Sequence, residues 1–273
     1  MIDLHCNMLP AIDDGAADLK TALKMAEMAV EDGITITACT PHIYPGLYEN
    51  TADGIRQAAV NFQQELNKAS IPLKITYGAD VQIIPELLER LKNGNIPTLH
   101  NSRYFLFEPP HHISPPGMID LIHDVLASGY IPVITHPERL TYIDNEYDLF
   151  VEAAHKGAWI QLTAGSVTGR FGRHVQKVAE RFLNDGLTHL LATDAHNLGN
   201  RSPNLSEARD AAATLLGEEE ANRLVTERPT SVINNDQPDT ITPPPGLLPG
   251  AQKRQRNTSA QKSWFKKLFN KVD

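Results

Sequence analysis

Near its middle the chain reads Ile131-Pro132-Val133-Ile134-Thr135-His136, and this stretch decides the fold class. Its first five residues are mostly apolar or β-branched, which predicts a short buried strand over 131–135. Helical patterns of apolar residues stand on either side of it, over 118–127 and 146–156. A buried strand between two helices is typical of a parallel sheet with helical crossovers. A histidine then follows directly at the carboxyl end of that strand.

The same alternation runs along most of the chain. Apolar, β-branched stretches predict seven strands, at residues 2–4, 34–40, 73–77, 104–107, 131–135, 159–163 and 189–192. Helical patterns separate nearly all of them, at residues 19–32, 51–69, 85–92, 118–127, 146–156 and 174–184, and two more follow at 206–216 and 218–226. Strands connected in this way run parallel in an α/β fold. An open doubly wound sheet and a closed barrel both fit the order.

Polar residues at the strand ends separate these two folds. Six of the seven predicted strands are followed by a histidine or a carboxylate: His5, His42, Asp80, Glu108, His136, and Asp194 with His196. An open sheet would spread these side chains along a line, whereas a barrel gathers them around one rim, where barrel enzymes keep their active sites. We therefore expect a distorted βα barrel of about seven parallel strands.

The residue types at the rim predict a metal centre. Imidazole and carboxylate ligands together suit Zn²⁺, Mn²⁺ or Fe²⁺. With Asp13 and Asp14 close behind the first strand, the set is too large for one tetrahedral ion. Two or three ions that share carboxylates would activate water and stabilise a displacement at phosphorus. A lone histidine is more often structural, and an acidic residue before a helix is more often a cap, but their joint occurrence at successive strand ends favours the metal site.

Two arginines follow the ligand positions. Arg139 ends the segment His136-Pro137-Glu138-Arg139, and Arg201 lies five residues after His196. A guanidinium group binds phosphate through two parallel hydrogen bonds. A surface salt bridge explains either arginine alone equally well. Beside the metal ligands, the two arginines predict a hydrolase that acts on phosphoesters.

Composition bears on the compartment and the partners. The chain has 273 residues with two cysteines, and it opens without the basic and apolar regions of a secretory signal, so we expect a reducing, cytoplasmic location. Seven of the 25 basic residues and one of the 33 acidic residues lie in 251–273, which leaves the rest at a net charge of about −14. An acidic body is a poor binder of nucleic acid, and none is expected as a partner.

Seven short segments form a recognisable set. They are Ile2-Asp3-Leu4-His5, Ile12-Asp13-Asp14-Gly15, Thr40-Pro41-His42, Tyr77-Gly78-Ala79, Ile96-Pro97-Thr98-Leu99, His136-Pro137-Glu138-Arg139 and Asp194-Ala195-His196-Asn197. The set resembles that of the bacterial PHP-type (polymerase and histidinol phosphatase) tyrosine-protein phosphatases of capsule and exopolysaccharide operons, which are CpsB/CapC-like. The resemblance covers about residues 1–232. It implies a PHP-type barrel that dephosphorylates the phosphotyrosine tail of a membrane-associated autokinase, which controls polysaccharide synthesis and export.

The resemblance also implies roles for the rim residues. It implies up to three metal ions, usually Mn²⁺, with Fe²⁺ and Zn²⁺ as alternatives. Arg139 and Arg201 match the phosphate-binding arginines of the family. The implied ligands are His5 and Asp194 for the first ion, Glu108 and His136 for the second, and Asp14, His42 and His196 for the third.

Two ligand positions depart from the family pattern. Asn7 stands where the family has a second histidine, and Asp80 stands where it has a glutamate that bridges the first two ions. An amide oxygen is a poorer ligand than imidazole for these metals, and Asp80 is one methylene shorter. Both changes fall on the first ion, so we expect weakened binding there. Ala11 also replaces a common glycine.

Alternative functions remain open at this point. A phosphatase of small molecules, such as histidinol phosphate, would use the same ligands. A degenerate regulator would bind the kinase tail without hydrolysing it, because Asn7 and Asp80 weaken the first ion's site.

The last part of the chain has a different composition. We expect the barrel to cover residues 1–233, a proline-rich flexible linker to cover 234–260, and a basic amphipathic helix to cover 261–273. Trp264, Phe265, Leu268 and Phe269 share one helical face, and lysines lie largely away from it. This pattern predicts weak contact with the inner membrane face or docking to a partner, with a frayed end as the plain alternative.

Overall fold

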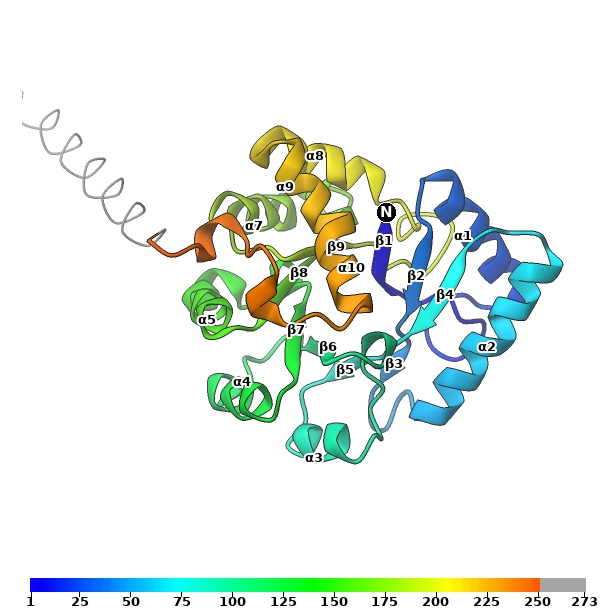
Figure 1. Ribbon diagram of the computed structural model, residues 1–273, viewed down its shortest axis with the longest axis horizontal. Coiled ribbons are helices and arrows are strands. Elements are labelled where there is room, and N and C mark those ends of the chain that lie inside the picture. Colours follow the sequence, from blue (N-terminus) through cyan, green and yellow to red (C-terminus); the bar gives the residue numbers. More distant parts are fainter. Residues whose placement is uncertain (251–273) are drawn as a thin grey trace, which may run out of the picture.

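The computed structural model describes residues 1–250, and residues 251–273 lie outside the described part. Helices surround a ring of strands (Figure 1). The strands are β1 (Ile2–Cys6), β2 (Ile36–Cys39), β3 (His42–Ile43), β4 (Lys74–Tyr77), β5 (Asp80–Gln82), β6 (Tyr104–Glu108), β7 (Ile131–Thr135), β8 (Trp159–Thr163) and β9 (Leu190–Ala192). Seven of them lie at the seven predicted positions, and the short strands β3 and β5 are additional.

The ring closes into a barrel. The strands form two sheets, β1-β2-β4 and β3-β5-β6-β7-β8-β9, in which all neighbours are parallel. Backbone hydrogen bonds bring the chain just past β9 back to β1: the amide of Asp194 donates to the His5 carbonyl, and the amide of Asn7 donates to the Ala195 carbonyl, each at 2.8 Å. The predicted distorted barrel is therefore confirmed.

Two short strands, β3 and β5, follow β2 and β4 and were not predicted from the sequence. β2 stops before Pro41 and resumes as β3, while β4 stops before Gly78 and resumes as β5. Proline has no N–H with which to continue the hydrogen bonds of a strand. At Gly78 the chain lies so close to Leu99 that a Cβ would be 2.9 Å from Leu99 Cδ2. Both short strands join the larger sheet. His42 and Asp80 lie past the ends of β2 and β4, as predicted, and in addition each begins a short strand of its own.

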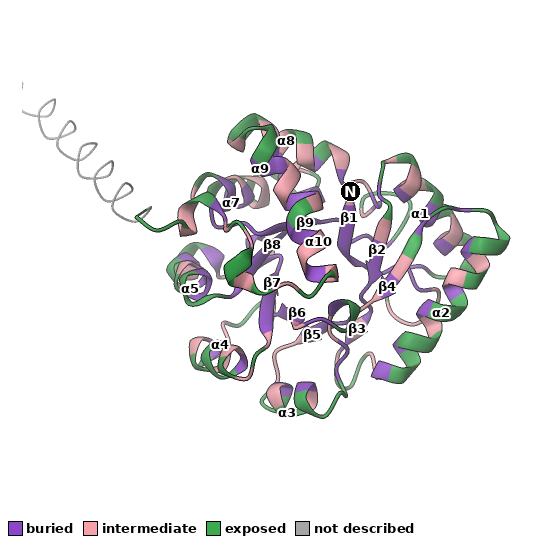
Figure 2. Cartoon of the chain, viewed as in Figure 1, coloured by how far each residue is buried: buried purple, intermediate pink, exposed green. Residues whose placement is uncertain are grey.

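The helices lie outside the ring. They are α1 (Leu19–Glu31), α2 (Ala52–Lys68), α3 (Leu87–Lys92), α4 (Met118–Ala127), α5 (Ile143–Lys156), α6 (Ala164–Val167), α7 (Arg173–Asn184), α8 (Ser206–Leu216), α9 (Glu218–Asn222) and α10 (Arg228–Ile233). Figure 2 shows buried residues on the strands and on the inner sides of the helices, with exposed residues facing outward. The short α6 was not predicted. The helix predicted over 218–226 instead continues through a π-helical turn, η3 (Arg223–Glu227), into α10. Within residues 1–250 no helix has both the length and the apolar composition that a bilayer crossing requires.

Alternating side chains on β6 show how the barrel is filled. Phe105 and Phe107 pack in the large apolar cluster shared with the outer helices, whereas Tyr104 and Leu106 pack in a smaller interior cluster. Because successive residues of a strand point to opposite faces, Glu108 continues the interior row. Its carboxylate therefore stands above the apolar interior, at the C-terminal pole of the barrel.

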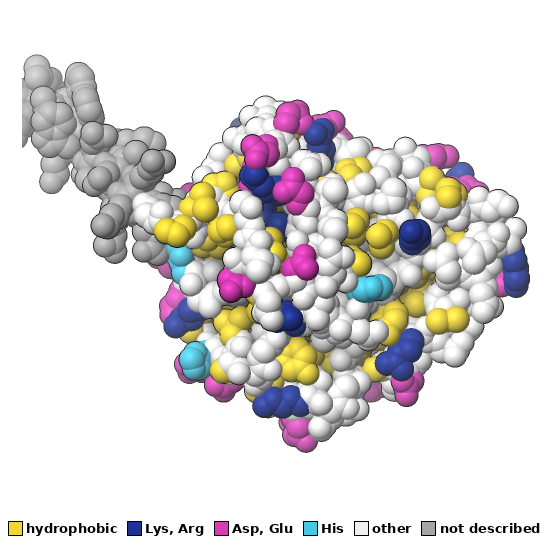
Figure 3. All heavy atoms as spheres, in the orientation of Figure 1, with side chains coloured by type: hydrophobic (Ala, Val, Ile, Leu, Met, Phe, Trp, Pro, Cys, Tyr) yellow, Lys and Arg dark blue, Asp and Glu magenta, His cyan; other side chains and the backbone are white. Residues whose placement is uncertain are grey.

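The opposite pole is closed by α10. Val232 of this helix belongs to the interior cluster together with Ile2, Tyr104 and Trp159, which lie at the amino ends of their strands. Figure 3 shows charged side chains of both signs scattered over the face that carries α10. The C-terminal pole is consequently the end of the barrel that remains for a functional site.

The chain after α10 runs along the barrel. The amide of Arg103 donates to Asn235, the hydroxyl of Tyr104 donates to the Asp236 carbonyl, and the buried guanidinium of Arg228 donates to the Thr242 carbonyl. Further on, the amide of Gly246 donates to the Gly186 carbonyl at 2.9 Å. This part of the predicted linker is packed against the barrel, because its backbone satisfies polar groups that the barrel leaves open. The helix predicted over 261–273 lies outside the described residues.

Candidate metal centre

The C-terminal pole brings together the predicted histidines and carboxylates. His5 lies on β1, His42 begins β3, Asp80 begins β5 and Glu108 ends β6. The loops supply the others, which are Asp14 after β1, His136 after β7, and Asp194 and His196 after β9. Side chains from all round the ring therefore face a common space, as the pattern of strand ends predicted.

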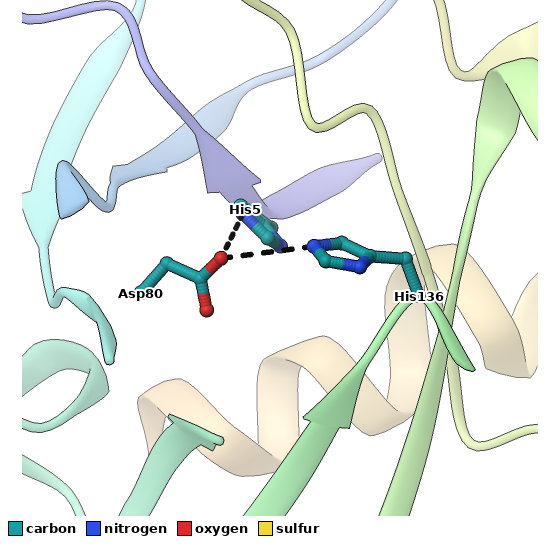
Figure 4. Close-up of side chains that lie close together, drawn as sticks. All are labelled: His5, Asp80 and His136. Atoms are coloured by element: carbon teal, nitrogen blue, oxygen red, sulfur yellow. Dashed lines mark ion pairs between the residues drawn. The ribbon is translucent and has the colours of Figure 1, made fainter. Parts of the chain in front are cut away.

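The deepest group contains His5, Asp80 and His136, whose side chains point toward one another (Figure 4). Asp80 Oδ2 lies 3.4 Å from His5 Nε2 and 3.7 Å from His136 Nε2. His5 Nε2 is also 3.4 Å from Asp194 Oδ1. All four residues are buried. These separations are longer than those of most hydrogen bonds, and they match the distances between ligands around one ion.

The residues of this group are held from below by polar side chains of the barrel interior. His5 Nδ1 lies 2.9 Å from Gln161 Oε1 on β8. Because an amide oxygen only accepts, the proton is assigned to Nδ1, and the lone pair of Nε2 faces the carboxylates. The hydroxyl of Thr135 donates to Asp80 Oδ1 at 3.5 Å. Partners of this kind fix the orientation of metal-binding side chains.

A second group contains Asp14, His42 and His196. Asp14 Oδ1 lies 3.4 Å from His196 Nε2 and 3.6 Å from His42 Nε2. His196 Nδ1 is held by the Asp194 carbonyl at 2.9 Å, which directs Nε2 toward Asp14. These are the three residues that the resemblance assigned to one ion. Asp14 is half-exposed, so this group lies nearer to solvent than the first.

Glu108 stands between these groups and adds a histidine that the sequence analysis missed. His42 Nδ1 lies 3.8 Å from both Asp80 Oδ2 and Glu108 Oε2. On the other side, His111 and His136 form a further group with Glu108. His111 follows Glu108 by three residues, past two prolines. Its short distance in sequence from a strand-end carboxylate could have indicated a ligand. His112 is the next residue and lies at almost the same distance, so the sequence alone does not distinguish the two histidines.

The protonation of these groups is set by burial and by their neighbours. Burial opposes the charged form of His5, but the carboxylates of Asp80 and Asp194 outweigh it and raise its pKa to about 9. Burial and the charge of Arg139 lower the pKa of His136 to about 3. Burial, followed by the charge of Asp80, raises the pKa of Glu108 well above its usual range. A bound cation favours the deprotonated form of every such ligand.

Two of the site residues have strained backbone. His136 has φ of 35° and Asp194 has φ of 48°, both in the left-handed region that side chains other than glycine avoid. His136 follows directly after β7, and Asp194 is the second residue after β9. At both places the chain must turn the side chain inward over the pole. Strain of this kind gathers at functional sites, where the surrounding structure fixes it.

The two predicted arginines meet at one carboxylate oxygen. Arg139 Nη1 and Arg201 Nη2 donate to Asp194 Oδ2 at 2.5 and 2.7 Å. The guanidinium of Arg139 also lies over the ring of Phe171, 5.0 Å from its centre. Both arginines line the same pocket as Asp14, His42, Glu108 and His136. Both guanidinium groups are thereby held at the edge of the candidate metal-binding residues.

The pocket holds about 290 Å³ and has an aromatic rim. Tyr44, Leu47 and Tyr48 line it from the loop after β3. The ring of Tyr48 stacks on His42 with 5.9 Å between centres and an angle of 20° between planes. The rim was not predicted from the sequence, since tyrosines in a loop give no signal without the fold.

Asn7 behaves differently from the predicted ligands around it. Its amide nitrogen donates to Asp13 Oδ2 at 2.8 Å, and Asp13 in turn accepts from the backbone amide of His42. Its Oδ1 is buried and has no hydrogen-bond partner in residues 1–250. Asn7 thus fixes the loop that carries Asp14, and only its oxygen is left for an ion. In the same loop Ala11 has φ of 60°, a conformation that suits glycine better.

Unpaired polar atoms at this pole fit bound cations. Within the described chain, buried atoms without a hydrogen-bond partner include His5 Nε2, His42 Nδ1, Asp80 Oδ2, Asp194 Oδ1 and His196 Nε2. Buried polar atoms normally have partners, so a concentration of exceptions needs a cause. All of them are atoms that bind transition metals, and the donor set of imidazoles and carboxylates suits Mn²⁺, Fe²⁺ or Zn²⁺.

Sequence comparisons connect this chain with bacterial phosphatases. A family model described as "Capsular polysaccharide synthesis, CpsB/CapC" matches residues 1–234. Tyrosine-protein phosphatase YwqE of Bacillus subtilis (strain 168) is 38% identical over 208 residues, which cover 76% of this chain and 82% of YwqE. Tyrosine-protein phosphatase CpsB of Streptococcus agalactiae is 30% identical over 240 residues, which cover 86% of this chain and 99% of CpsB.

Solved structures agree with the sequence matches. One is described as "Crystal structures of YwqE from Bacillus subtilis and CpsB from Streptococcus pneumoniae, unique metal-dependent tyrosine phosphatases". It matches with a TM-score of 0.85 and 35% identity, and the match covers 90% of this chain and 98% of that chain. A probable 2-pyrone-4,6-dicarboxylic acid hydrolase from Acinetobacter baumannii matches with a TM-score of 0.50 at 16% identity over 85% of this chain and 98% of that chain, which indicates a shared fold alone.

Proposed function

The chain belongs to the CpsB/CapC family of capsular polysaccharide synthesis, and on this premise we propose that it is a metal-dependent phosphatase of protein phosphotyrosine. The relatives are tyrosine-protein phosphatases, and the solved relatives are described as metal-dependent. The reaction is the hydrolysis of a phosphoric monoester. The observation that carries the proposal is the convergence of unpaired imidazole and carboxylate atoms in a pocket that two arginines line.

The ligands fall into three sets. His5 and Asp194, with the oxygen of Asn7, would hold the first ion, and Glu108 and His136 the second. Asp80 lies between these two sets and would bridge them, and Asp14, His42 and His196 would hold the third. Ions in such a cluster supply an activated water and neutralise charge on the phosphoryl oxygens. We propose Mn²⁺ as the metal, with Fe²⁺ and Zn²⁺ as alternatives that the same ligands accept.

Arg139 and Arg201 bind the phosphate in this mechanism. Asp194 holds both guanidinium groups at the pocket through one oxygen, and their remaining N–H groups are free to donate to phosphate oxygens. The stacking of Phe171 under Arg139 limits the movement of that side chain. Charge that develops on the phosphoryl group in the transition state is then met by donors already in position.

The aromatic rim suits a phosphotyrosine rather than a small aliphatic phosphate. Tyr44, Leu47 and Tyr48 line the pocket beside the candidate ligands, where they would pack against the phenyl ring of a phosphotyrosine. Aromatic rings pack favourably against one another and exclude water from the site. In histidinol phosphate, the substrate of the rival hypothesis, a three-carbon chain separates the imidazole ring from the phosphate, so its ring would not lie where the phenyl ring of phosphotyrosine lies and would gain less from this rim.

The cysteines support water rather than a thiol as the nucleophile. Cys6 and Cys39 are fully buried. Burial raises the pKa of the Cys6 thiol well above its usual value, and the nearby charge of Asp3 adds to the effect. A catalytic cysteine needs a lowered pKa and an accessible sulfur.

We further propose that the substrate is the phosphotyrosine tail of a membrane-associated autokinase, that the chain works in the cytoplasm, and that nucleic acid is not a partner. The family's role in capsular polysaccharide synthesis supports the first point. The two free, buried cysteines suit a reducing compartment. The acidic body of the chain disfavours nucleic acid.

Kinetics on two substrates test the proposal. The full chain, loaded with Mn²⁺, is assayed on a phosphotyrosine peptide and on histidinol phosphate. We expect kcat/KM for the peptide to be larger by at least about tenfold, which is a difference of about 1.4 kcal/mol in transition-state binding. A preference for histidinol phosphate would make the chain a small-molecule phosphatase. Tight peptide binding with no turnover of either substrate would make it a regulatory binder.

A further inference from the structure

His111 sits on the loop after β6, at the wall of the metal pocket, and the pattern of family motifs gives it no role. Its Nε2 lies 3.8 Å from Glu108 Oε1. Its ring stacks on the ring of His136, with 5.4 Å between centres and an angle of 29° between planes. The side chain is about one-third exposed, so it borders both the pocket and the buried ligands.

The donor atoms of these three residues surround a small space. Glu108 Oε1 is 3.8 Å from His111 Nε2 and 3.9 Å from His136 Nε2. One donor atom from each of the three lies within 4.8 Å of the others. Ligands bound at about 2.0–2.2 Å to one ion stand roughly 3–4.4 Å apart, depending on their angle at the metal. The observed separations leave room for one ion and are too long for hydrogen bonds.

The loop that carries His111 is fixed at this residue. Its carbonyl accepts hydrogen bonds from the backbone amide of Thr141 at 3.0 Å and from the Thr141 hydroxyl at 3.1 Å. Thr141 follows shortly after Arg139, so the loop is tied to the segment that carries His136 and a phosphate-binding arginine. A ligand held by its backbone loses less conformational entropy when it binds an ion.

We propose that His111 is a further side-chain ligand of the ion that Glu108 and His136 hold and that Asp80 would bridge. Two imidazoles and one carboxylate on one side of an ion leave further positions open for water or phosphate. Of the two positions that weaken the first ion, Asn7 lies outside this set, while Asp80 would also reach this ion as the bridge between the first two. The chain thus has an extra histidine at the second ion where it lacks one at the first. The inference rests on the proposed metal-dependent function, but its test does not depend on turnover.

His112 provides a matched control. It is the next residue on the same loop and the same amino acid, but it is exposed. Its ring lies 6.3 Å from that of His111, and it belongs to none of the potential metal-binding groups of the described residues. Substitution of either histidine would change loop stability or net charge, whereas only substitution of His111 would remove a ligand.

Two pairs of variants test the proposal in the full chain. Metal-free protein is titrated with Mn²⁺ by calorimetry, and H111A should bind one ion at least about tenfold more weakly than the parent while H112A binds as the parent does. With Co²⁺ as the probe, H111C should show a sulfur-to-cobalt charge-transfer band that H112C lacks, because only a thiolate bound to the ion gives this band. Identical Mn²⁺ binding by H111A and H112A would overturn the proposal. A parent that binds three ions but does not hydrolyse phosphotyrosine would refute the proposed function and leave this inference standing.

Discussion

Asn7 and Asp80 are the residues at which this site departs from the ligand pattern that the family resemblance implies. Asn7 turns its amide nitrogen to Asp13, which leaves one neutral oxygen for the first ion. Asp80 reaches His5 and His136 at 3.4 and 3.7 Å in spite of its shorter side chain. The carboxylate of Asp80 is thus still central to the deepest group. Of the two replacements, Asn7 is therefore the poorer metal ligand.

We predict that N7H increases occupancy of the first ion, because imidazole binds Mn²⁺ and Fe²⁺ better than a neutral amide does. The gain should be larger in N7H/D80E, which restores both family residues together. Bound metal after dialysis against a low Mn²⁺ concentration, measured by atomic emission, gives the result directly. If the double variant keeps no more metal than the parent, the first ion does not use these two positions.

Gly15 stands next to Asp14 in the loop that Asn7 holds. A Cβ at Gly15 would lie 2.0 Å from the Asn7 carbonyl oxygen, which is backbone and cannot move aside. The amide of Ala16 also donates to this carbonyl at 3.0 Å, so the two chain segments touch. The loop is therefore locked against β1 at the residue that follows a predicted ligand.

G15A should displace Asp14 and lower the free energy of unfolding by about 1–3 kcal/mol, the usual cost of overpacking. Affinity for the third ion should fall with it. G199A is the control, because a Cβ at Gly199 meets only Asn197 Oδ1 at an ordinary 3.5 Å. Urea unfolding of both variants without metal measures the stability, and Mn²⁺ titration measures the affinity for the third ion. Equal stability of the two variants would mean that the loop adapts.

At the level of helices and strands, the sequence predicted type and order well. All seven strand regions and the helices at 118–127 and 206–216 appear in the structure at or near their predicted bounds. Periodic patterns are reliable because they report burial of one face. The strand ends before Pro41 and Gly78 were predicted, but the short strands β3 and β5 beyond them were not, since a single proline or glycine does not say whether a strand resumes after it. His111 and the aromatic rim escaped for a related reason: their proximity to the ligands depends on loops whose paths follow from the completed barrel.

The segment after α10 packs against the barrel, and its contribution to stability can be tested. Its prolines and glycines predicted a flexible linker, yet it covers the hydroxyl of Tyr104 and the guanidinium of Arg228. A chain that ends at Asn234 loses these contacts, while a chain that ends at Gly250 keeps them. Buried polar groups that lose their partners cost about 1–3 kcal/mol each.

We expect the chain ending at Asn234 to unfold at a lower urea concentration than the chain ending at Gly250, by about 2–4 kcal/mol in stability. The double substitution of Tyr104 by Phe and Arg228 by Met in the longer chain should reproduce part of the loss. Superimposable unfolding curves for the two lengths would show that the segment merely rests on the barrel.

On the scale of the whole molecule, charge divides the chain into two parts. Residues 251–273 carry seven of the 25 basic residues, and the remainder is acidic. An acidic body is repelled by an anionic membrane, so any recruitment must come from the basic tail. Each lysine near such a surface contributes roughly 1 kcal/mol, and apolar side chains add burial.

Deletion of 251–273 should therefore leave hydrolysis of a soluble phosphotyrosine peptide nearly unchanged and weaken sedimentation with anionic vesicles. The binding of the full chain should fall at high salt, because electrostatic attraction to the surface is screened. Trp264 gives a second readout, as its fluorescence shifts to the blue in an apolar interface. Equal sedimentation of both lengths would assign the tail to a protein partner, to be sought by pull-down with the autokinase.

We propose that the ring of histidines and carboxylates works by holding metal ions. The most direct measurement is the rate of phosphotyrosine-peptide hydrolysis before chelation, after chelation with EDTA and removal of the chelator, and during titration with Mn²⁺. Chelation should abolish the activity, and Mn²⁺ should restore it in step with two to three bound ions per chain. Activity that survives complete removal of metal, and that is lost instead in C6S, would contradict the account.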